Sequence, residues 1–136
     1  MSHLQNKSEI FKASAKLLHD NDYYPAVAHG AYYSCYQLLK HIWLYVMGKT
    51  ETELDLQIRY ANLGSHDFLI NQISIYIKSS KKKDCEDNFR NFNKNILSLK
   101  KLRHEADYKD SLFDRTKSSN SLLLSTDVIN ILNKYK

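Results

Sequence analysis

Four side chains that can bind an anion or transfer a proton fall close together near the end of a predicted helix: Arg103, His104, Asp107 and Tyr108. At about 100° per residue, Arg103 lies in the middle of an apolar arc made by Phe89, Phe92, Ile96, Leu99 and Ala106. A cation facing inward needs an anion or several acceptors, because an unpaired buried charge is costly. Asp107, one turn on, can pair with Arg103, and His104 can pair with Tyr108 on the adjoining side. The spacing predicts an ion pair that either locks this helix to a tyrosine-rich neighbour or organises a ligand-binding cleft.

The elements that must position these residues are all expected to be helices. Amphipathic periodicity predicts helices over 2–19, 25–48, 65 to about 77, 84–108 and a final segment that holds Leu122 to Leu132. The second is apolar on nearly all sides and about 34 Å long, so we expect it to be the central helix of a bundle. Residues 50–63 permit a short helix or a loop, and residues 109–120 are expected to form a polar link.

Cap and turn residues delimit these helices. Pro25 suits a first helical turn and Gly48 a C-terminal cap, while Ser65 and Asp84 are expected N-caps. Gly30, inside the central helix, costs about 1 kcal/mol relative to Ala. Its position therefore predicts a place where another backbone comes close, either from this chain or from a second one.

Length and composition restrict the class of protein. The chain has 136 residues, which predicts a single domain over 1–136. Three Gly and one Pro are too few for the turns of an all-β fold or for a glycine-rich phosphate loop. A hydrophobic content of 43% argues against disorder, and no stretch approaches the roughly 20 apolar residues of a membrane span. We expect an all-α protein that has no contact with a membrane.

The expected location is the cytoplasm. Residues 1–10 lack the apolar stretch of an export signal. Cys35 and Cys85 are far apart and have no paired Cys or His ligands, so they are expected to be reduced thiols. The sequence predicts no metal site and no cofactor.

The positive charge is concentrated in one segment. Residues 78–103 contain nine basic and three acidic side chains, a local charge of +6, whereas the whole chain carries +5. These cations can attract phosphates or an acidic partner over a long range. They can equally form a solvated helix face and a lysine-rich loop, Lys78 to Lys83, whose role the sequence leaves open.

Two motifs carry a more specific resemblance. The segment 24–34, YPAVAHGAYYS, resembles the Y-x-x-A-x-x-x-A-Y-Y-A signature on the long helix of HEPN (higher eukaryotes and prokaryotes nucleotide-binding) domains. Residues 103–108, RHEADY, resemble the R-x-x-A-D-Y helix ending of a prokaryotic subfamily, and Ser65-His66 is similar to the start of its middle helix. The resemblance implies an up-and-down bundle of four or five helices. It also implies a homodimer and a role in toxin-antitoxin or phage-defence systems or beside a nucleotidyltransferase partner.

Many HEPN proteins are metal-independent RNases, which implies a second possibility. Their active motif is an Arg followed by a His after four to six intervening residues. The corresponding positions after Arg103 are Tyr108, Lys109 and Asp110, so the usual His is missing. His104 can replace it only if an irregular helix end or a second protomer brings it to Arg103, because successive helix residues point about 100° apart. A phenol such as Tyr108 is a poor base at neutral pH, where an imidazole is a good one.

Three functional hypotheses follow. The preferred one is a nucleotide-, RNA- or partner-binding module whose site contains Arg103, Asp107, Tyr108, His66 and Tyr33. The second is an RNase toxin in which Arg103 steadies the phosphate and His104 or His66 moves protons. The third is an oligomeric structural scaffold.

The other histidines and the tyrosines are expected to have structural roles. His29 and His41 are expected to be hydrogen-bonded packing residues, and His66 is expected to cap its helix rather than line the cleft. The aromatic residues of the second helix and the turn before it could stack on bases as in single-strand binders. Helical spacing inside an apolar helix favours core packing instead for Tyr23, Tyr24, Tyr32, Tyr33 and Tyr36.

Overall fold

The computed structural model describes all residues 1–136 and contains only helices. These are α1 (His3–Asp20), α2 (Tyr24–His41) with a π-helical continuation (Ile42–Val46), α3 (Glu51–Ala61), α4 (Ser65–Ser79), α5 (Cys85–Tyr108) and α6 (Arg115–Leu132). The prediction of an all-α bundle is confirmed. None of the helices combines the length and the apolar character that a bilayer crossing requires.

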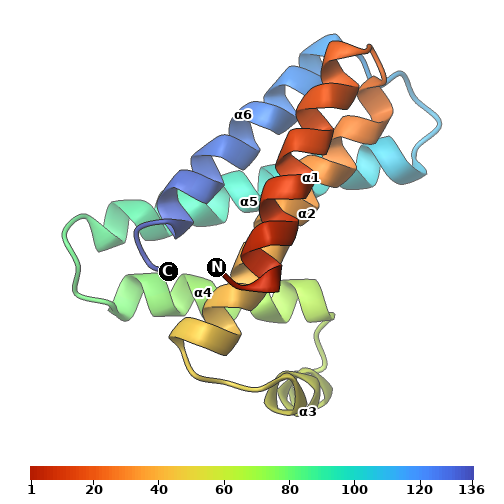
Figure 1. Cartoon of the computed structure of the whole chain (residues 1–136). Coiled ribbons are helices and arrows are strands. Elements are labelled where there is room, and N and C mark those ends of the chain that lie inside the picture. Colours follow the sequence, from red (N-terminus) through yellow and green to blue (C-terminus); the bar gives the residue numbers. More distant parts are fainter.

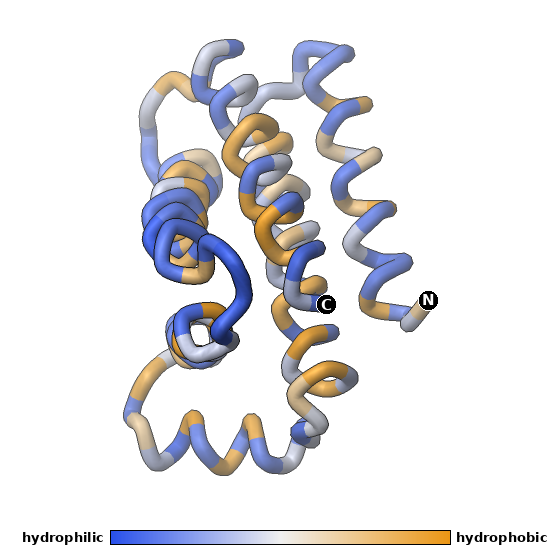
Figure 2. The backbone as a smooth tube through the Cα atoms, turned by 90° about the vertical axis from the view of Figure 1, so that its left-hand side faces the viewer, coloured by the Kyte–Doolittle hydropathy of each residue, from blue (hydrophilic) through white to orange (hydrophobic).

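The helices form two layers. In Figure 1, α1, α2 and α6 run side by side, and α4 and α5 cross them. Figure 2, turned by 90°, shows the crossing pair nearly end-on while the other long helices run vertically. The central helix is α2, as predicted, because it packs against α1, α6, α5 and α4. An apolar surface on nearly all sides of α2 requires this, since each neighbour can cover only one side.

Trp43, Tyr32, Tyr135 and Phe92 are the largest side chains of the core between the two layers, and all four are almost fully buried. Phe92, Ile96 and Leu99 of α5 point into it, on the arc that the sequence predicts. Arg103 continues this arc toward the end of α5. The core thus fixes which side of α5 faces α2.

Gly30 marks the close approach of α1 to α2. A Cβ atom at this position would lie 3.2 Å from the Phe11 carbonyl oxygen and 3.3 Å from the Ala15 Cβ atom. The predicted neighbouring backbone is therefore the chain's own first helix. The absence of a side chain at Gly30 lets α1 pack directly on α2.

Side-chain caps mark the starts of α1, α3 and α6. Ser2 and Gln5 form a reciprocal capping box at α1, and Gly48, with φ of +68°, follows the π-helical turn that ends the second helix. The segment that the sequence left open is helical because the Thr50 side chain accepts a hydrogen bond from the Glu53 backbone N–H. With α3, the bundle has six α-helices.

One expected boundary and two details of capping differ from the sequence prediction. The N-cap of α4 is Gly64 rather than Ser65. Asp84 is the N-cap residue of α5, as predicted, but it has φ of +62° and its side chain makes no capping hydrogen bond. The last helix begins at Arg115, within the expected polar link, because the Asp114 side chain accepts from the Lys117 backbone N–H. These ends depend on backbone conformation in the loops, which helical periodicity does not encode.

Candidate functional site: an arginine held among tyrosines and histidines

A cluster of polar and aromatic side chains lies where α2, α4 and α5 meet. Arg103 of α5 is its centre, and only 12% of this side chain is exposed. Its guanidinium carbon lies 5.1 Å from the centre of the Tyr32 ring and 5.8 Å from that of Tyr33. Arg103 Nη1 donates to Asp107 Oδ2 at 3.3 Å. The predicted inward orientation of Arg103 and its pairing with Asp107 are both present.

His66 closes the cluster from α4. Its Nδ1 lies 2.8 Å from the Tyr32 hydroxyl oxygen. The imidazole stacks on Tyr36, with ring centres 4.2 Å apart, and meets the edge of Tyr33 at 5.7 Å. The expectation that His66 caps its helix is wrong, because Gly64 takes the cap position and the first turn of α4 directs His66 toward α2.

His29 joins the cluster from the solvent side. Its Nδ1 lies 3.2 Å from Asp107 Oδ2, the same oxygen that accepts from Arg103. The His29 ring also contacts Tyr33, at 4.7 Å between centres, yet 52% of the side chain is exposed. The expectation of a packing residue is therefore wrong for His29. It is confirmed for His41, which is buried and bonded through Nδ1 to the Ser2 hydroxyl at 2.8 Å.

The guanidinium of Arg103 is incompletely satisfied. A guanidinium has five N–H donors, and the hydrogen bond to Asp107 uses one of them. The Nε atom is buried and has no hydrogen-bond partner. A nearly buried cation with spare donors is poorly compensated by the protein alone, so an additional anion at this position is electrostatically favourable.

An apolar groove reaches this cluster from one side. It runs between α1 and α2, has a volume of about 440 Å³, and ends at the imidazole of His29 and the carboxylate of Asp107. Its apolar walls come from Ile10, Phe11, Leu18 and Ala26. The cluster is thus accessible at its His29–Asp107 edge, and a ligand there would have polar groups at one end and an apolar wall beside it.

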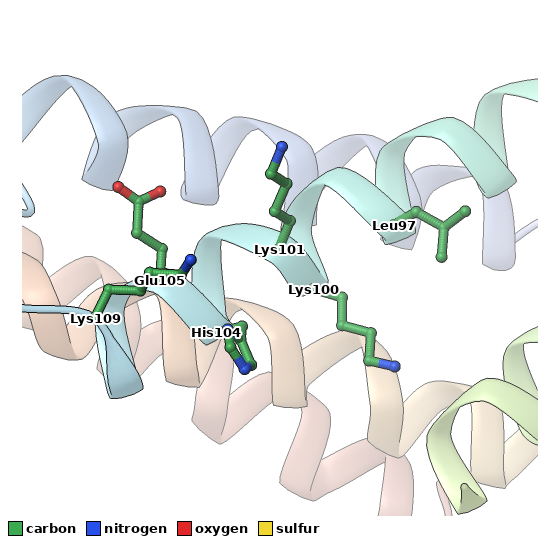
Figure 3. Close-up of a pocket in the computed structure, with 6 residues that line it drawn as sticks. All are labelled: Leu97, Lys100, Lys101, His104, Glu105 and Lys109. Atoms are coloured by element: carbon green, nitrogen blue, oxygen red, sulfur yellow. The ribbon is translucent and has the colours of Figure 1, made fainter. Parts of the chain in front are cut away.

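His104 and Tyr108 are not part of this cluster. Their rings pair with each other at 5.0 Å, as the spacing predicts, but both lie on the opposite side of α5 and are exposed. Because α5 stays helical through Tyr108, no irregular helix end brings His104 to Arg103. His104 lines a groove of about 490 Å³ along α5, where Figure 3 shows it with Lys100, Lys101 and Glu105. The predicted site residues therefore divide into an inner set and an outer pair.

Burial and charge favour a neutral imidazole in the cluster. Burial lowers the pKa of His66 below its usual 6.5, and the positive charges of Arg103 and Lys100 lower it further, while Asp67 acts in the opposite direction. Burial also raises the pKa of the Tyr32 hydroxyl, which keeps it protonated. At neutral pH the pair therefore consists of a phenol and a neutral imidazole.

The lowered pKa of His66 predicts acid sensitivity of folding. Near pH 6 the unfolded chain binds more protons at this residue than the folded chain, so the free energy of unfolding should fall as the pH drops from 7.5 to 5.5. The pKa of His41 is also lowered, mainly by burial, and adds to the effect. Urea unfolding at several pH values measures this pH dependence of the free energy of unfolding. The decrease should be smaller in His66→Gln and in His41→Gln, and an unchanged pH dependence in both variants would contradict the prediction.

Sequence reasoning missed His29, Tyr32 and Tyr36 as members of the site. Together with Tyr33 they recur at helical spacing on one face of α2, the face that α4 and α5 partly cover. This regular spacing was the available signal. The same spacing also favours core packing, because the fully buried Tyr32 and the half-exposed Tyr33 and Tyr36 look alike in sequence.

The remaining reactive groups form no second centre. Cys35 is buried in contact with Ser125, and burial raises the pKa of its thiol to about 11; Cys85 is also unpaired. No group of three or more His, Cys, Asp or Glu side chains is arranged to hold a metal ion.

Comparison of the chain with models of known families, with curated proteins and with solved structures found no match.

Proposed function

We propose that this protein is an HEPN-like module that binds nucleotide or RNA phosphate at the Arg103 cluster. The observation that carries the proposal is the guanidinium of Arg103, nearly buried between Tyr32 and Tyr33 and left with a buried Nε that has no partner. A phosphate oxygen would accept from spare N–H groups at Nη1 and Nη2 and would supply the missing negative charge, while the enclosed Nε stays unpaired. The two sequence motifs that resemble HEPN domains lie on α2 and α5, the helices that build the cluster.

The surrounding rings suit a nucleotide better than a bare anion. Tyr33 and Tyr36 are half-buried, and His66 lies against both. Aromatic faces beside a cation can hold a base while the cation holds its phosphate.

We further propose that the protein is a homodimer and that it has a nucleotidyltransferase partner. We propose that it acts in the cytosol, where its two unpaired thiols would stay reduced.

Thermal shift with a graded set of probes tests the proposal. We expect ADP and a short single-stranded RNA to raise the Tm, because ligands that bind only the folded state stabilise it by mass action. Adenosine, which lacks phosphate, should have a much smaller effect, and inorganic phosphate should show weak stabilisation. No shift with any phosphate-containing probe at millimolar concentration would contradict the proposal and would favour the scaffold hypothesis.

A second candidate, a metal-independent RNase, is favoured by one observation. His29 of α2 and His66 of α4 both contact the Tyr33 ring, and His29 also contacts Asp107, the partner of Arg103. His66 as a neutral imidazole could remove the proton of a 2′-hydroxyl, while His29 as a protonated imidazolium donates a proton to the leaving oxygen. Incubation with RNA in EDTA tests this candidate. Cleavage that is lost in both His29→Gln and His66→Gln would support it, and intact RNA at high protein concentration would contradict it.

A further inference from the structure

A second cationic surface lies on the side of α5 that faces away from the core. Five residues at alternating spacings of three and four make up this outer face: Lys94, Leu97, Lys101, His104 and Tyr108. This is the spacing of a single stripe along a helix, and all five side chains are exposed. The stripe is about 21 Å long. It is separate from the Arg103 cluster, which occupies the inner side of the same helix.

The cations of the outer face are available to a partner. Lys94 and Lys101 make no ion pair, whereas the neighbouring Lys100 is held by Asp67. Both acidic side chains in the last two turns of α5 already form ion pairs. Glu105 pairs with Lys117, and Asp107 pairs with Arg103 and contacts His29. The outer face therefore contains lysines and no acidic side chain, which indicates an anionic partner.

Two aromatic rings and a groove accompany these charges. Tyr108 is 69% exposed, and its ring lies 5.0 Å from that of His104. The outer groove of about 490 Å³ is lined by Leu97, Lys100, Lys101, His104 and Lys109, and also by Glu105, whose carboxylate is paired with Lys117 (Figure 3). Such exposed rings are poorly explained by solubility, because a solvated helix face gains nothing from them.

We infer that the outer face of α5 binds single-stranded nucleic acid, with Lys94 and Lys101 on phosphates and the His104–Tyr108 rings stacked on bases. Lys94 and Lys101 lie two turns apart, about 10.5 Å along the helix, so they would contact different phosphates. Interleaved cations and exposed rings are typical of sequence-tolerant single-strand binders. An acidic peptide would need the lysines but not the rings. A membrane surface would need more aliphatic side chains than Leu97.

The test is a fluorescence anisotropy titration of the full chain with a labelled oligouridylate of about 20 nucleotides, between 50 and 300 mM NaCl. The double variant Lys94→Glu/Lys101→Glu should bind at least about tenfold more weakly at low salt. Each phosphate contact contributes a slope of about 0.7 to the dependence of log K on log salt for single strands, so the slope should decrease by about 1.4. Tyr108→Ala should weaken binding several-fold and leave the slope unchanged, because the ring is uncharged.

Matched controls make the result specific to this surface. Lys7→Glu/Lys12→Glu changes the net charge by the same amount on exposed, unpaired lysines of α1, and Tyr60→Ala removes an exposed tyrosine of α3. Both should bind like the parent. All altered positions are exposed, and circular dichroism checks that each variant is folded.

Three results would overturn the inference. The first is that the α1 control pair weakens binding equally, which indicates non-specific attraction. The second is that the oligouridylate does not bind at 50 mM NaCl. The third is that a polyglutamate peptide binds in a manner that depends on Lys94 and Lys101, whereas the oligonucleotide does not bind. Because Arg103 stays unchanged in these variants, ADP should still raise their Tm. Failure of this inference is therefore distinguishable from failure of the proposal for the Arg103 cluster.

Discussion

Replacing Arg103 with Ala should weaken binding of ADP by about 10- to 100-fold, with only a small loss of stability. Hydrogen bonds to charged groups are worth about 1.5–3 kcal/mol, which corresponds to this range. The stability loss should stay near 1 kcal/mol, because the lost contacts with Tyr32, Tyr33 and Asp107 are offset by removal of a buried Nε that has no partner. Isothermal titration measures the binding, and urea unfolding measures the stability.

Two further variants show whether the effect belongs to the guanidinium itself. Arg103→Lys keeps the charge but loses the planar fork and its stacking on the rings, so its affinity should lie between those of the parent and the Ala variant. Arg90→Ala removes an exposed arginine of the same helix, paired with Asp87, and should leave binding unchanged. Affinity of Arg103→Ala equal to that of the parent would remove Arg103 from the site.

Replacing Tyr32 with Ala should produce the largest loss of stability among the site residues, about 3–5 kcal/mol. The Tyr32 ring is fully buried at the centre of the bundle, so truncation leaves a cavity between α2 and its neighbours. The same change removes the surface on which the Arg103 guanidinium rests and the hydrogen bond to His66. Urea unfolding should show a lower midpoint, and any folded fraction should bind ADP weakly.

The Tyr32→Phe variant separates the ring from its hydroxyl. It keeps the packing and the contact with Arg103 and loses only the bond to His66, so the cost should be about 1 kcal/mol and ADP affinity should stay within about threefold of the parent. Tyr60→Ala, at an exposed position of α3, should change the stability by less than about 0.5 kcal/mol. A cost below about 1 kcal/mol for Tyr32→Ala would contradict the central position of this ring.

Much of the fold could be predicted from the sequence because it depends on local periodicity. The apolar pattern of residues 25–48 required cover on all sides, and α2 has four helices packed against it. The arc of Phe92, Ile96 and Leu99 predicted which side of α5 faces inward. The scarcity of Gly and Pro excluded most sheet folds. Helix ends were less predictable, since Gly64, Asp84 and Asp114 act through loop conformations that periodicity does not describe.

Helical spacing predicted contacts of the site only where its residues share one helix, although Tyr33 and His66 were also expected in it. Arg103 and Asp107 lie one turn apart, so their pairing followed from helical geometry. His29 and His66 come from helices far apart in the sequence, and no local pattern indicates that α4 turns His66 onto Tyr36 or that His29 meets Asp107.

The sequence by itself determined that the chain is a helical bundle with an inward-facing arginine and a concentration of positive charge over residues 78–103. Short-range periodicity carries that information, because the side of a helix on which a residue lies depends only on its spacing from its neighbours. Only the tertiary structure decided which residues of the other helices surround Arg103. Those contacts depend on how separate helices cross, which is set by packing of the whole core.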